Sequence, residues 1–493
     1  MAAGSEREAS APRRGGARRL DALARSLAPP AVRVAVLAAI TAVLCLGGVA
    51  RVPLDGDPAM YATIARTVLE TGEWTHLTFN GVPYLNKPPL HFWLNALVFA
   101  VAGRSTFTAV LLPGLLGVLC TLLVYLLVRR TLGEDAEAGG REAAFLAALV
   151  YTTTPEVVHW SRGVHLETLL TAWILLGLLA AYRSVREPSA VLWLAIAAIG
   201  GWFAKGPQGL FPLAVAAVLW AHAGVLVRRA LSPWSIAGCT LALATVGPWL
   251  AARLTEGSDF AHAYFEGQIG QVLIEPGRLG RGPLWYVAKL ARTYWPWLPA
   301  AAAGFALLGR RSRTSLGARL WLVFAAIVTV VISIAANKKS RYLFQLYPAL
   351  AVAAGLALHR LARRLPALPL ALLAASALAA IVVAYRGERV SRAQREHSAA
   401  GLAIAAALPP DRPAWITHAV QYGEPQLGKI VGFYARPLLR TCRTLCAEEA
   451  EPGASIVARA DEAELVAREV GAEIRVRRGI LALLVRSPQR DFR

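Results

Sequence analysis

Acidic and basic side chains in this sequence gather in a few polar stretches that separate long apolar segments. The stretch from 51 to 90 opens with Asp55 and Asp57 and nearly ends with Lys87, and a later polar turn carries Glu167. A carboxylate can accept a proton from a hydroxyl group, whereas a lysine can bind a phosphate. Acids and a cation in one stretch therefore indicate a reaction on a phosphate-containing substrate.

More cationic residues stand where apolar sequence would otherwise continue. Lys205 interrupts an apolar run in the motif AKGPQGL, and Lys338, Lys339 and Arg341 belong to the motif NKKSRY. Ionisable groups at membrane depth are costly, so they are functional candidates by default. Lys338 and Lys339 also break the rule that cationic loops stay inside, which favours a role in binding phosphate. Combined with the acids, these cations predict group transfer from a lipid phosphate.

The composition is that of a polytopic α-helical membrane protein. Of 493 residues, 56% are hydrophobic, the mean hydropathy is positive, and apolar runs approach the roughly 20 residues that a membrane-spanning helix needs. The formal net charge of +21 does not require a nucleic-acid partner. Arginines cluster at alternate span ends, as the positive-inside rule expects, so the excess charge is a matter of topology.

The pattern of spans predicts the organisation of the chain. We expect a disordered basic cytoplasmic tail over 1–30, without a cleavable signal peptide, and about eleven membrane spans within 31–385. Two long outer loops are expected at 51–105 and 253–284. Alternating strand and helix patterns over 386–493 predict a small α/β domain on the outer, periplasmic side. The segment PPLHFWLN is kept on the membrane surface, because otherwise several arginine clusters would lie outside.

The first outer loop should itself form a helix. Asp57 can serve as the N-cap with Pro58 at the first helical position, and Gly72 should end the helix. A stripe on one face predicts that this helix lies on the membrane surface. The stripe consists of Met60, Tyr61, Ile64, Ala65 and Val68.

The candidate residues also have simpler interpretations. Asp57 would be only a helix cap, Asp55 only a solvated loop acid, and Lys87 only a side chain that reaches the membrane interface. His159 and His165 would simply face water, since their spacing gives weak support for a zinc site. A divalent metal is therefore unsupported, and the reaction as expected requires no cofactor.

Two of the cysteines fall in the outer domain. Cys442 and Cys446 are expected to form a disulfide, because the outer compartment is not reducing. Two unpaired thiols are the alternative. Two cysteines without partner histidines are a weak metal signal.

Several motifs together resemble a known enzyme family. The run DPAMYATIARTVLETGEWTHLTFNGVPYLNKPPLHFWL resembles the first outer loop of polyprenyl-phosphate-sugar-dependent glycosyltransferases of the C-type membrane fold. These enzymes include lipid A aminoarabinose transferases and protein O-mannosyltransferases. The segments RGVHLETLLTAW, AKGPQGL, PLWYV and RYLFQLYPAL continue the resemblance in the expected order.

The resemblance implies roles for particular residues. Asp57 matches the catalytic aspartate of the first loop, and Glu167 matches an acid that lines the site. Tyr84 and Lys87 match residues that approach the carrier phosphate, and Tyr342 matches a tyrosine on the phosphate side. The chain departs from the family at Asn86, where aminoarabinose transferases have a glutamate, and in the second outer loop. There Gln271 is among glutamines found in place of an expected arginine and histidine, and Arg278 or Arg281 would supply the missing charge.

The resemblance implies an inverting glycosyltransferase of the bacterial inner membrane. Its donor would be a polyprenyl-phosphate-linked sugar, and its acceptor a lipid, a glycan or a protein on the periplasmic side. Asp57, helped by Asp55 or Glu167, would deprotonate the acceptor. Lys87, Lys205, Arg341 and Tyr342 would stabilise the leaving phosphate. The alternatives are a transporter or flippase of lipid-linked sugars, which would more often show internal repeats, and an inactive assembly subunit.

Overall fold

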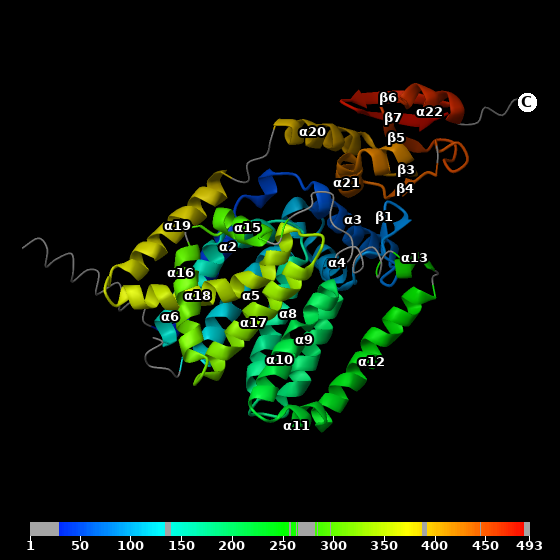
Figure 1. Ribbon diagram of the computed structural model, residues 1–493. Coiled ribbons are helices and arrows are strands. Elements are labelled where there is room, and N and C mark those ends of the chain that lie inside the picture. Colours follow the sequence, from blue (N-terminus) through cyan, green and yellow to red (C-terminus); the bar gives the residue numbers. More distant parts are fainter. Residues whose placement is uncertain are drawn as a thin grey trace, which may run out of the picture.

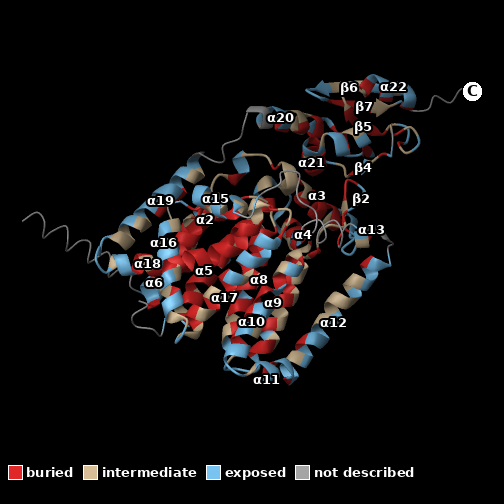
Figure 2. Cartoon of the chain, viewed as in Figure 1, coloured by how far each residue is buried: buried red, intermediate tan, exposed pale blue. Residues whose placement is uncertain are grey.

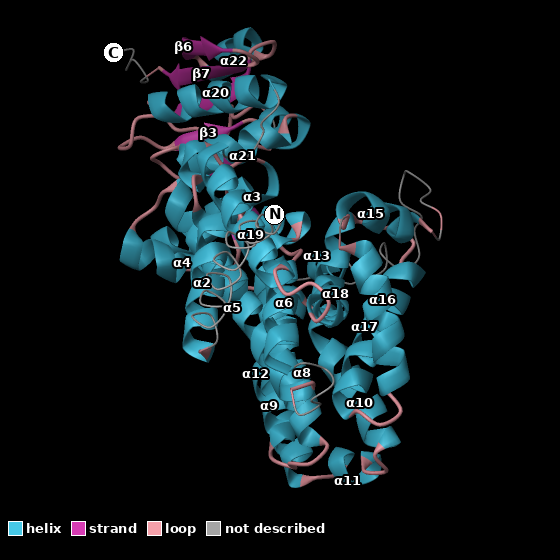
Figure 3. Ribbon diagram, turned by 90° about the vertical axis from the view of Figure 1, so that its left-hand side faces the viewer, coloured by secondary structure: helices cyan, strands magenta, loops and turns pink. Residues whose placement is uncertain are grey.

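The protein is a bundle of long helices with a small sheet region above one end (Figures 1 and 3). The computed structural model describes residues 29–133, 140–255, 258–262, 264, 282, 284–295, 297–386, 392–443 and 445–487. Arg278, Arg281 and Gln271 of the second outer loop therefore lie outside the described residues.

Each predicted membrane span falls on one helix of the bundle. These helices are α2 (Pro30–Leu46), α5 (Thr106–Thr131), α6 (Gly140–Thr153), α8 (Glu167–Ser184), α9 (Ala190–Lys205), α10 (Phe211–His222), α12 (Pro233–Leu254), α16 (Leu298–Arg311), α17 (Leu316–Ile334), α18 (Tyr347–Ala362) and α19 (Leu368–Arg386). Within the described residues, six helical segments are long and apolar enough to cross a bilayer by length and composition. The fold is thus a polytopic membrane bundle, and the number of crossings stays a prediction.

The bundle has a buried centre and a more exposed periphery (Figure 2). In the segment of α18, 94% of the most apolar window is buried, against 6% for α12. Close packing at the centre depends on small residues: a Cβ on Gly304 would lie 1.7 Å from a backbone atom of α18, and one on Gly355 would lie 2.6 Å from the backbone of α6. Helices in lipid associate mainly through such close backbone approach.

Shorter elements cover the end of the bundle that faces the sheet region. They are α3 (Gly56–Thr71), β1 (Thr78–Phe79), β2 (Val82–Pro83), α4 (Leu90–Ala102), α7 (Pro155–Ser161), α13 (Ser258–Ala261), α15 (Trp285–Thr293) and η5 (Ser340–Leu346). The links at the opposite end include α11 (Leu226–Ala230). The candidate residues of the sequence therefore lie at one end of the bundle.

Helix α3 differs from the prediction in two ways. Its end at Gly72 is confirmed, since this residue has a positive φ of 74°, a conformation that glycine adopts without steric cost. Its start is not: Asp55, and not Asp57, occupies the N-cap position. The apolar stripe also does not lie against lipid, because it packs in a protein core with Phe92 of α4 and Phe433 of the C-terminal region.

The C-terminal region is an α/β structure with a mixed sheet of five strands. It contains α20 (Arg392–Ala407), β3 (Ala414–Ile416), η6 (Ala419–Gly423), α21 (Pro425–Tyr434), β4 (Leu439–Thr441), β5 (Ser455–Arg459), α22 (Ala463–Val470), β6 (Ala472–Arg478) and β7 (Leu481–Arg486). The strand order is β4-β3-β5-β7-β6, with β3 parallel to both neighbours and β7 antiparallel to β5 and β6. The boundary of this region at residue 386 stays a prediction.

A disulfide joins Cys442 and Cys446, whose Cα atoms are 5.0 Å apart. Both residues are buried in an apolar cluster with Trp415 and Ile456. The bond therefore closes the connection after β4 against one face of the sheet.

Arginines tie separate segments together by binding the carbonyl groups at helix ends. Arg51 donates to Ala384 and Tyr385 at the end of α19, and Arg162 donates to Leu44 near the end of α2. The last carbonyls of a helix have no partner within the helix and carry partial negative charge, so a guanidinium satisfies both needs. Positive charge here contributes to packing as well as to topology.

Candidate active site

Asp57 lies in the first turn of α3 with its carboxylate between two cations. Oδ1 is 3.1 Å from Nζ of Lys429, and Oδ2 is 3.7 Å from Nη1 of Arg341. The side chain of Asp57 remains 42% exposed, so the carboxylate is open to solvent and to a substrate. The interpretation of Asp57 as a helix cap is wrong, because Asp55 holds that position and the carboxylate of Asp57 is bound to these cations.

Lys429 is brought to this place by helix α21 of the C-terminal region. Arg66 of α3, which is 1% exposed, donates hydrogen bonds to the carbonyls of Gly432, Ala435 and Arg436 at the end of α21. Arg104 binds two of the last carbonyls of the same helix. Helix α21 is therefore fixed against α3 and against the start of α5.

The hairpin of β1 and β2 makes a second contact with the C-terminal region. Asn80, at a turn with a positive φ of 50°, donates to the side chain of Gln421 and to the carbonyl of Gly428. Thr441 of β4 donates in return to the carbonyl of Asn80. The first outer loop and the C-terminal region thus form one continuous structure around Asp57.

Glu167 and Lys205 form a buried ion pair near Arg341, the cation that faces Asp57. Nζ of Lys205 is 2.7 Å from Oε1 of Glu167, and the two side chains are 7% and 4% exposed. Glu167 begins α8 and Lys205 ends α9, so the hairpin of these helices returns the lysine to the level of the acid. A buried charge is costly unless an opposite charge lies beside it. Lys205 can therefore stay charged, and act on a nearby anion, because Glu167 is its partner.

Lys87 adds a cation whose charge is not guaranteed at neutral pH. Burial, together with repulsion from Lys205 and Arg341, lowers the pKa of Lys87 to about 7. Desolvation and a like charge both disfavour the protonated form of a lysine. A phosphate placed here would favour the charged form, so Lys87 is suited to bind an anion. The burial of Lys87 near Lys205 and Arg341 argues against the interpretation that its side chain merely reaches the membrane interface.

Aromatic side chains form an apolar wall next to these charges. The ring of Tyr84 lies edge-on to Tyr61, with centroids 6.4 Å apart, and to Phe92 at 5.7 Å. Burial raises the pKa of the Tyr84 hydroxyl well above its usual value, so this group is a neutral hydrogen-bond donor. Tyr342 of η5 is also buried and follows Arg341 directly.

Tyr84 and Lys87 also face the outlying helix α12. Together with Trp249 and Arg253 of α12 and with Phe260 of α13, they line a narrow cavity. Tyr84 and Lys87 are therefore next to the least buried of the six candidate spans found among the described residues.

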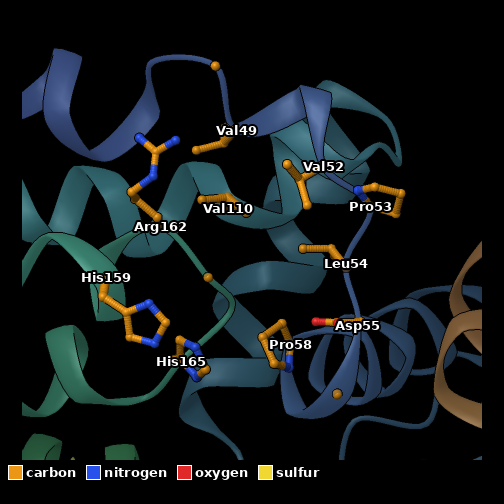
Figure 4. A pocket seen from close by; sticks show the side chains of 13 residues that line it. Val49, Val52, Pro53, Leu54, Asp55, Pro58, Val110, His159, Arg162 and His165 are labelled. Atoms are coloured by element: carbon orange, nitrogen blue, oxygen red, sulfur yellow. The ribbon is translucent and has the colours of Figure 1, made fainter. Parts of the chain in front are cut away.

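A larger cavity, of about 490 Å³, lies beside the loop that leads into α3 (Figure 4). Asp55 and Pro58 line it together with His159, Arg162 and His165. In Figure 4 the two imidazoles lie next to each other and Asp55 lies across from them; the ring centroids are 6.4 Å apart. Burial lowers the pKa of His165 to about 4, so its ring is neutral near pH 7.

Within the described residues the cationic side chains of this cluster outnumber its carboxylates. The cations are Lys87, Lys205, Lys339, Arg341 and Lys429, and the carboxylates are Asp57 and Glu167. Excess positive charge in a partly desolvated place attracts phosphate. Among the residues described, His, Cys, Asp and Glu do not gather in groups of three that could hold a metal ion.

The structure brings most of the predicted site residues together and adds others. Asp57, Glu167, Lys87, Lys205, Tyr84, Arg341 and Tyr342 meet at one end of the bundle, and Asp55 lines the adjacent cavity. Sequence reasoning missed Lys429, because nothing in the pattern of α21 distinguishes this lysine from a solvated one. It also undervalued His165, whose position two residues before Glu167 was a usable signal.

Comparison with known proteins identifies a family of similar sequences. Residues 86–251 match the family described as dolichyl-phosphate-mannose-protein mannosyltransferase. The undecaprenyl phosphate-alpha-4-amino-4-deoxy-L-arabinose arabinosyl transferase of Edwardsiella ictaluri is 27% identical over 61% of this chain and 56% of its own length. The corresponding protein of Pseudomonas aeruginosa is 28% identical over 63% of this chain and 56% of its own length. The chain thus spans little more than half the length of these relatives.

Solved structures show the same fold over nearly the whole chain. The crystal structure of ArnT from Cupriavidus metallidurans bound to undecaprenyl phosphate matches with a TM-score of 0.72 and 18% identity, covering 92% of this chain and 98% of that one. The apo structure of the same protein matches with a TM-score of 0.67. The predicted resemblance to polyprenyl-phosphate-sugar-dependent glycosyltransferases of the C-type membrane fold is confirmed.

Proposed function

We propose that this chain is a glycosyltransferase that moves a sugar from a polyprenyl-phosphate donor to a hydroxyl group of an acceptor. The acceptor is a lipid of the lipid A type, a glycan or a protein. The observation that carries the proposal is the exposed carboxylate of Asp57 beside a cluster of excess positive charge. This combination provides an acid–base group and a phosphate site at one place, as transfer from a lipid phosphate requires.

The residues support an inverting displacement at the first carbon of the sugar. The acceptor hydroxyl forms the new bond to this carbon while the bond to the phosphate oxygen breaks. The hydroxyl proton passes to Asp57, and the electron pair of the broken bond remains on the phosphate. Lys87, Arg341 and Tyr342 stabilise the charge that develops there, and the Glu167–Lys205 pair supports them.

The two groups of residues offer the reactants separate places. Tyr84 and Lys87 lie next to α12, and the donor phosphate would bind there with its isoprenoid chain along lipid. The cavity of about 490 Å³ lined by Asp55, His159 and His165 would admit the acceptor. We further propose that this end of the bundle is periplasmic, that the N-terminus is cytoplasmic, and that the protein resides in the bacterial inner membrane.

The proposal is tested with purified protein in nanodiscs and a radiolabelled undecaprenyl-phosphate sugar. Release of free lipid phosphate that depends on acceptor is the expected result. A flippase or an inactive assembly subunit would release none, and that outcome would overturn the proposal.

Replacing Asp57 tests the role of the carboxylate. Asp57→Asn keeps the shape of the side chain but removes the proton acceptor, so we expect turnover to fall roughly 100-fold or more with donor binding nearly unchanged. The matched control is Glu73→Gln, an exposed change in the same loop, which should leave turnover unchanged. An Asp57→Asn enzyme with more than about half of its turnover would remove Asp57 from the mechanism.

A further inference from the structure

We infer that Lys429 is a positioning residue for the reaction proposed above, on which this inference rests: the C-terminal region supplies the ammonium group that fixes the carboxylate of Asp57. The two residues are 372 positions apart in the chain, yet Nζ of Lys429 donates a hydrogen bond of 3.1 Å to Oδ1 of Asp57. The side chain of Lys429 is 15% exposed. It is thus enclosed by the interface between α21 and α3.

The position of Lys429 is set by the docking of its helix. The end of α21 is held by Arg66 and Arg104, and its middle is held by Asn80, which donates to the carbonyl of Gly428. A Cβ on Gly432 would lie 2.5 Å from the side chain of Asn80, so the helix approaches the hairpin closely. A cation on a helix with these constraints can hold its partner in one orientation.

The two cations that contact the carboxylate of Asp57 come from two different parts of the chain. Arg341, from η5 at the end of the bundle, faces Oδ2, and Lys429 faces Oδ1. Each carboxylate oxygen has two lone pairs, so an acceptor hydroxyl can still donate to either one. The hydrogen bond to Oδ1 and the longer ion pair at Oδ2 together restrict rotation of the carboxylate, so its free lone pairs keep a preferred direction.

This role differs from that of a phosphate ligand. Lys429 contacts the carboxylate of Asp57 directly, so its effect on the reaction passes through that acid. Its removal should therefore reduce the rate of the bound complex more than it weakens donor binding. A residue that only maintains folding would reduce the amount of active protein and leave both constants of the remaining enzyme unchanged.

The test compares Lys429→Met and Lys429→Arg in full-length protein with the undecaprenyl-phosphate sugar. We expect Lys429→Met to lower kcat about 10-fold with less than a 2-fold change in the KM for donor, and Lys429→Arg to retain most of kcat. The matched control is Lys289→Met, which removes another lysine at a partly buried ion pair, 3.1 Å from Glu156. The control should stay within 2-fold of the unaltered enzyme.

Two outcomes would overturn the inference. One is a raised KM with unchanged kcat, which would make Lys429 a ligand of the donor. The other is full additivity with Asp57→Asn: if Lys429 acts through Asp57, adding Lys429→Met to Asp57→Asn should change kcat by less than about 2-fold.

A second measurement separates this inference from the proposed activity. In donor-free protein, Asp57→Asn and Lys429→Met should shift the thermal unfolding midpoint non-additively, since each removes one charge of the same ion pair. If the two substitutions are coupled in thermal stability but the unaltered protein releases no lipid phosphate, the proposed function is refuted, while the contact between Asp57 and Lys429 is supported. Activity in the unaltered protein, with independent effects of the two substitutions, would refute the positioning role alone.

Discussion

At the scale of the residue, protonation of the Lys87 side chain couples donor binding to proton uptake. Its pKa of about 7 reflects burial and the nearby charges of Lys205 and Arg341. Because this pKa is depressed, the lysine is charged below pH 7 and loses its proton as the pH rises through that value. A bound phosphate favours the charged form. Above pH 7 the donor therefore has to bind together with a proton.

This coupling predicts a pH dependence of affinity. With an undecaprenyl-phosphate sugar, a diester with one fixed negative charge, the dissociation constant should rise roughly 5-fold between pH 7 and pH 8. Lys87→Arg should abolish the dependence, because arginine stays charged over this range. Equilibrium binding in nanodiscs between pH 6 and pH 9 measures both, and an unchanged slope in the arginine variant would show that another group titrates.

The residues themselves were predictable to different degrees. Asp57 and Lys87 were predicted because they lie in one polar stretch, and Lys205 because it interrupts an apolar run. The pairing of Lys205 with Glu167 was not predicted, although both belonged to the candidate set. It depends on how α8 and α9 pack, and periodicity does not report packing. Lys429 carries no local signal of its role, whereas His165 could have been found from its position two residues before Glu167.

At the scale of the element, α3 is the structural centre of the end of the bundle that faces the sheet region. It packs with its apolar stripe on α4 and contacts α21 through Arg66. The sequence predicted the helix and its end at Gly72, because propensity and the positive φ of a C-terminal glycine are local properties. It did not predict what covers the helix, since α21 follows several hundred residues later and presents only an ordinary amphipathic pattern.

Loss of the arginine between these helices should loosen α21. Arg66→Met removes a guanidinium that binds three carbonyls, two of them in buried contacts, at a cost of about 2 kcal/mol or more. Amide hydrogen exchange in α21 should then accelerate roughly 30-fold. Arg183→Met, which breaks an exposed pair with Glu187, is the control and should leave α21 unchanged. Equal exchange in α21 of the Arg66 variant and the unaltered protein would mean that other contacts hold the helix.

At the scale of the whole molecule, the charge distribution predicts the orientation in the membrane. The sequence holds 52 lysines and arginines against 31 acids, with arginine clusters at alternate span ends. The apolar runs were sufficient to predict a polytopic bundle, and the fold comparison confirms it. Sequence patterns could not reveal that the C-terminal region completes the surroundings of Asp57, because that contact depends on the arrangement of the entire bundle.

The orientation is measured by cysteine labelling in spheroplasts. Cys239, which is exposed on α12, is first replaced by serine. Thr75→Cys, in the first outer loop, should react with a membrane-impermeant maleimide, and Thr314→Cys, between α16 and α17, should react only after lysis. Both positions are exposed in the folded chain. Labelling of both from the same side would contradict the orientation.

The ion pair between Asp57 and Lys429 also has a consequence for biosynthesis. Asp57 leaves the ribosome 372 residues before Lys429, a delay of roughly 20 to 70 s at 5–20 residues per second. During that interval every later helix of the bundle is made and inserted. The surroundings of the acid are therefore completed last, and a chain that stops short of α21 carries all the other described site residues but lacks the ammonium group beside Oδ1.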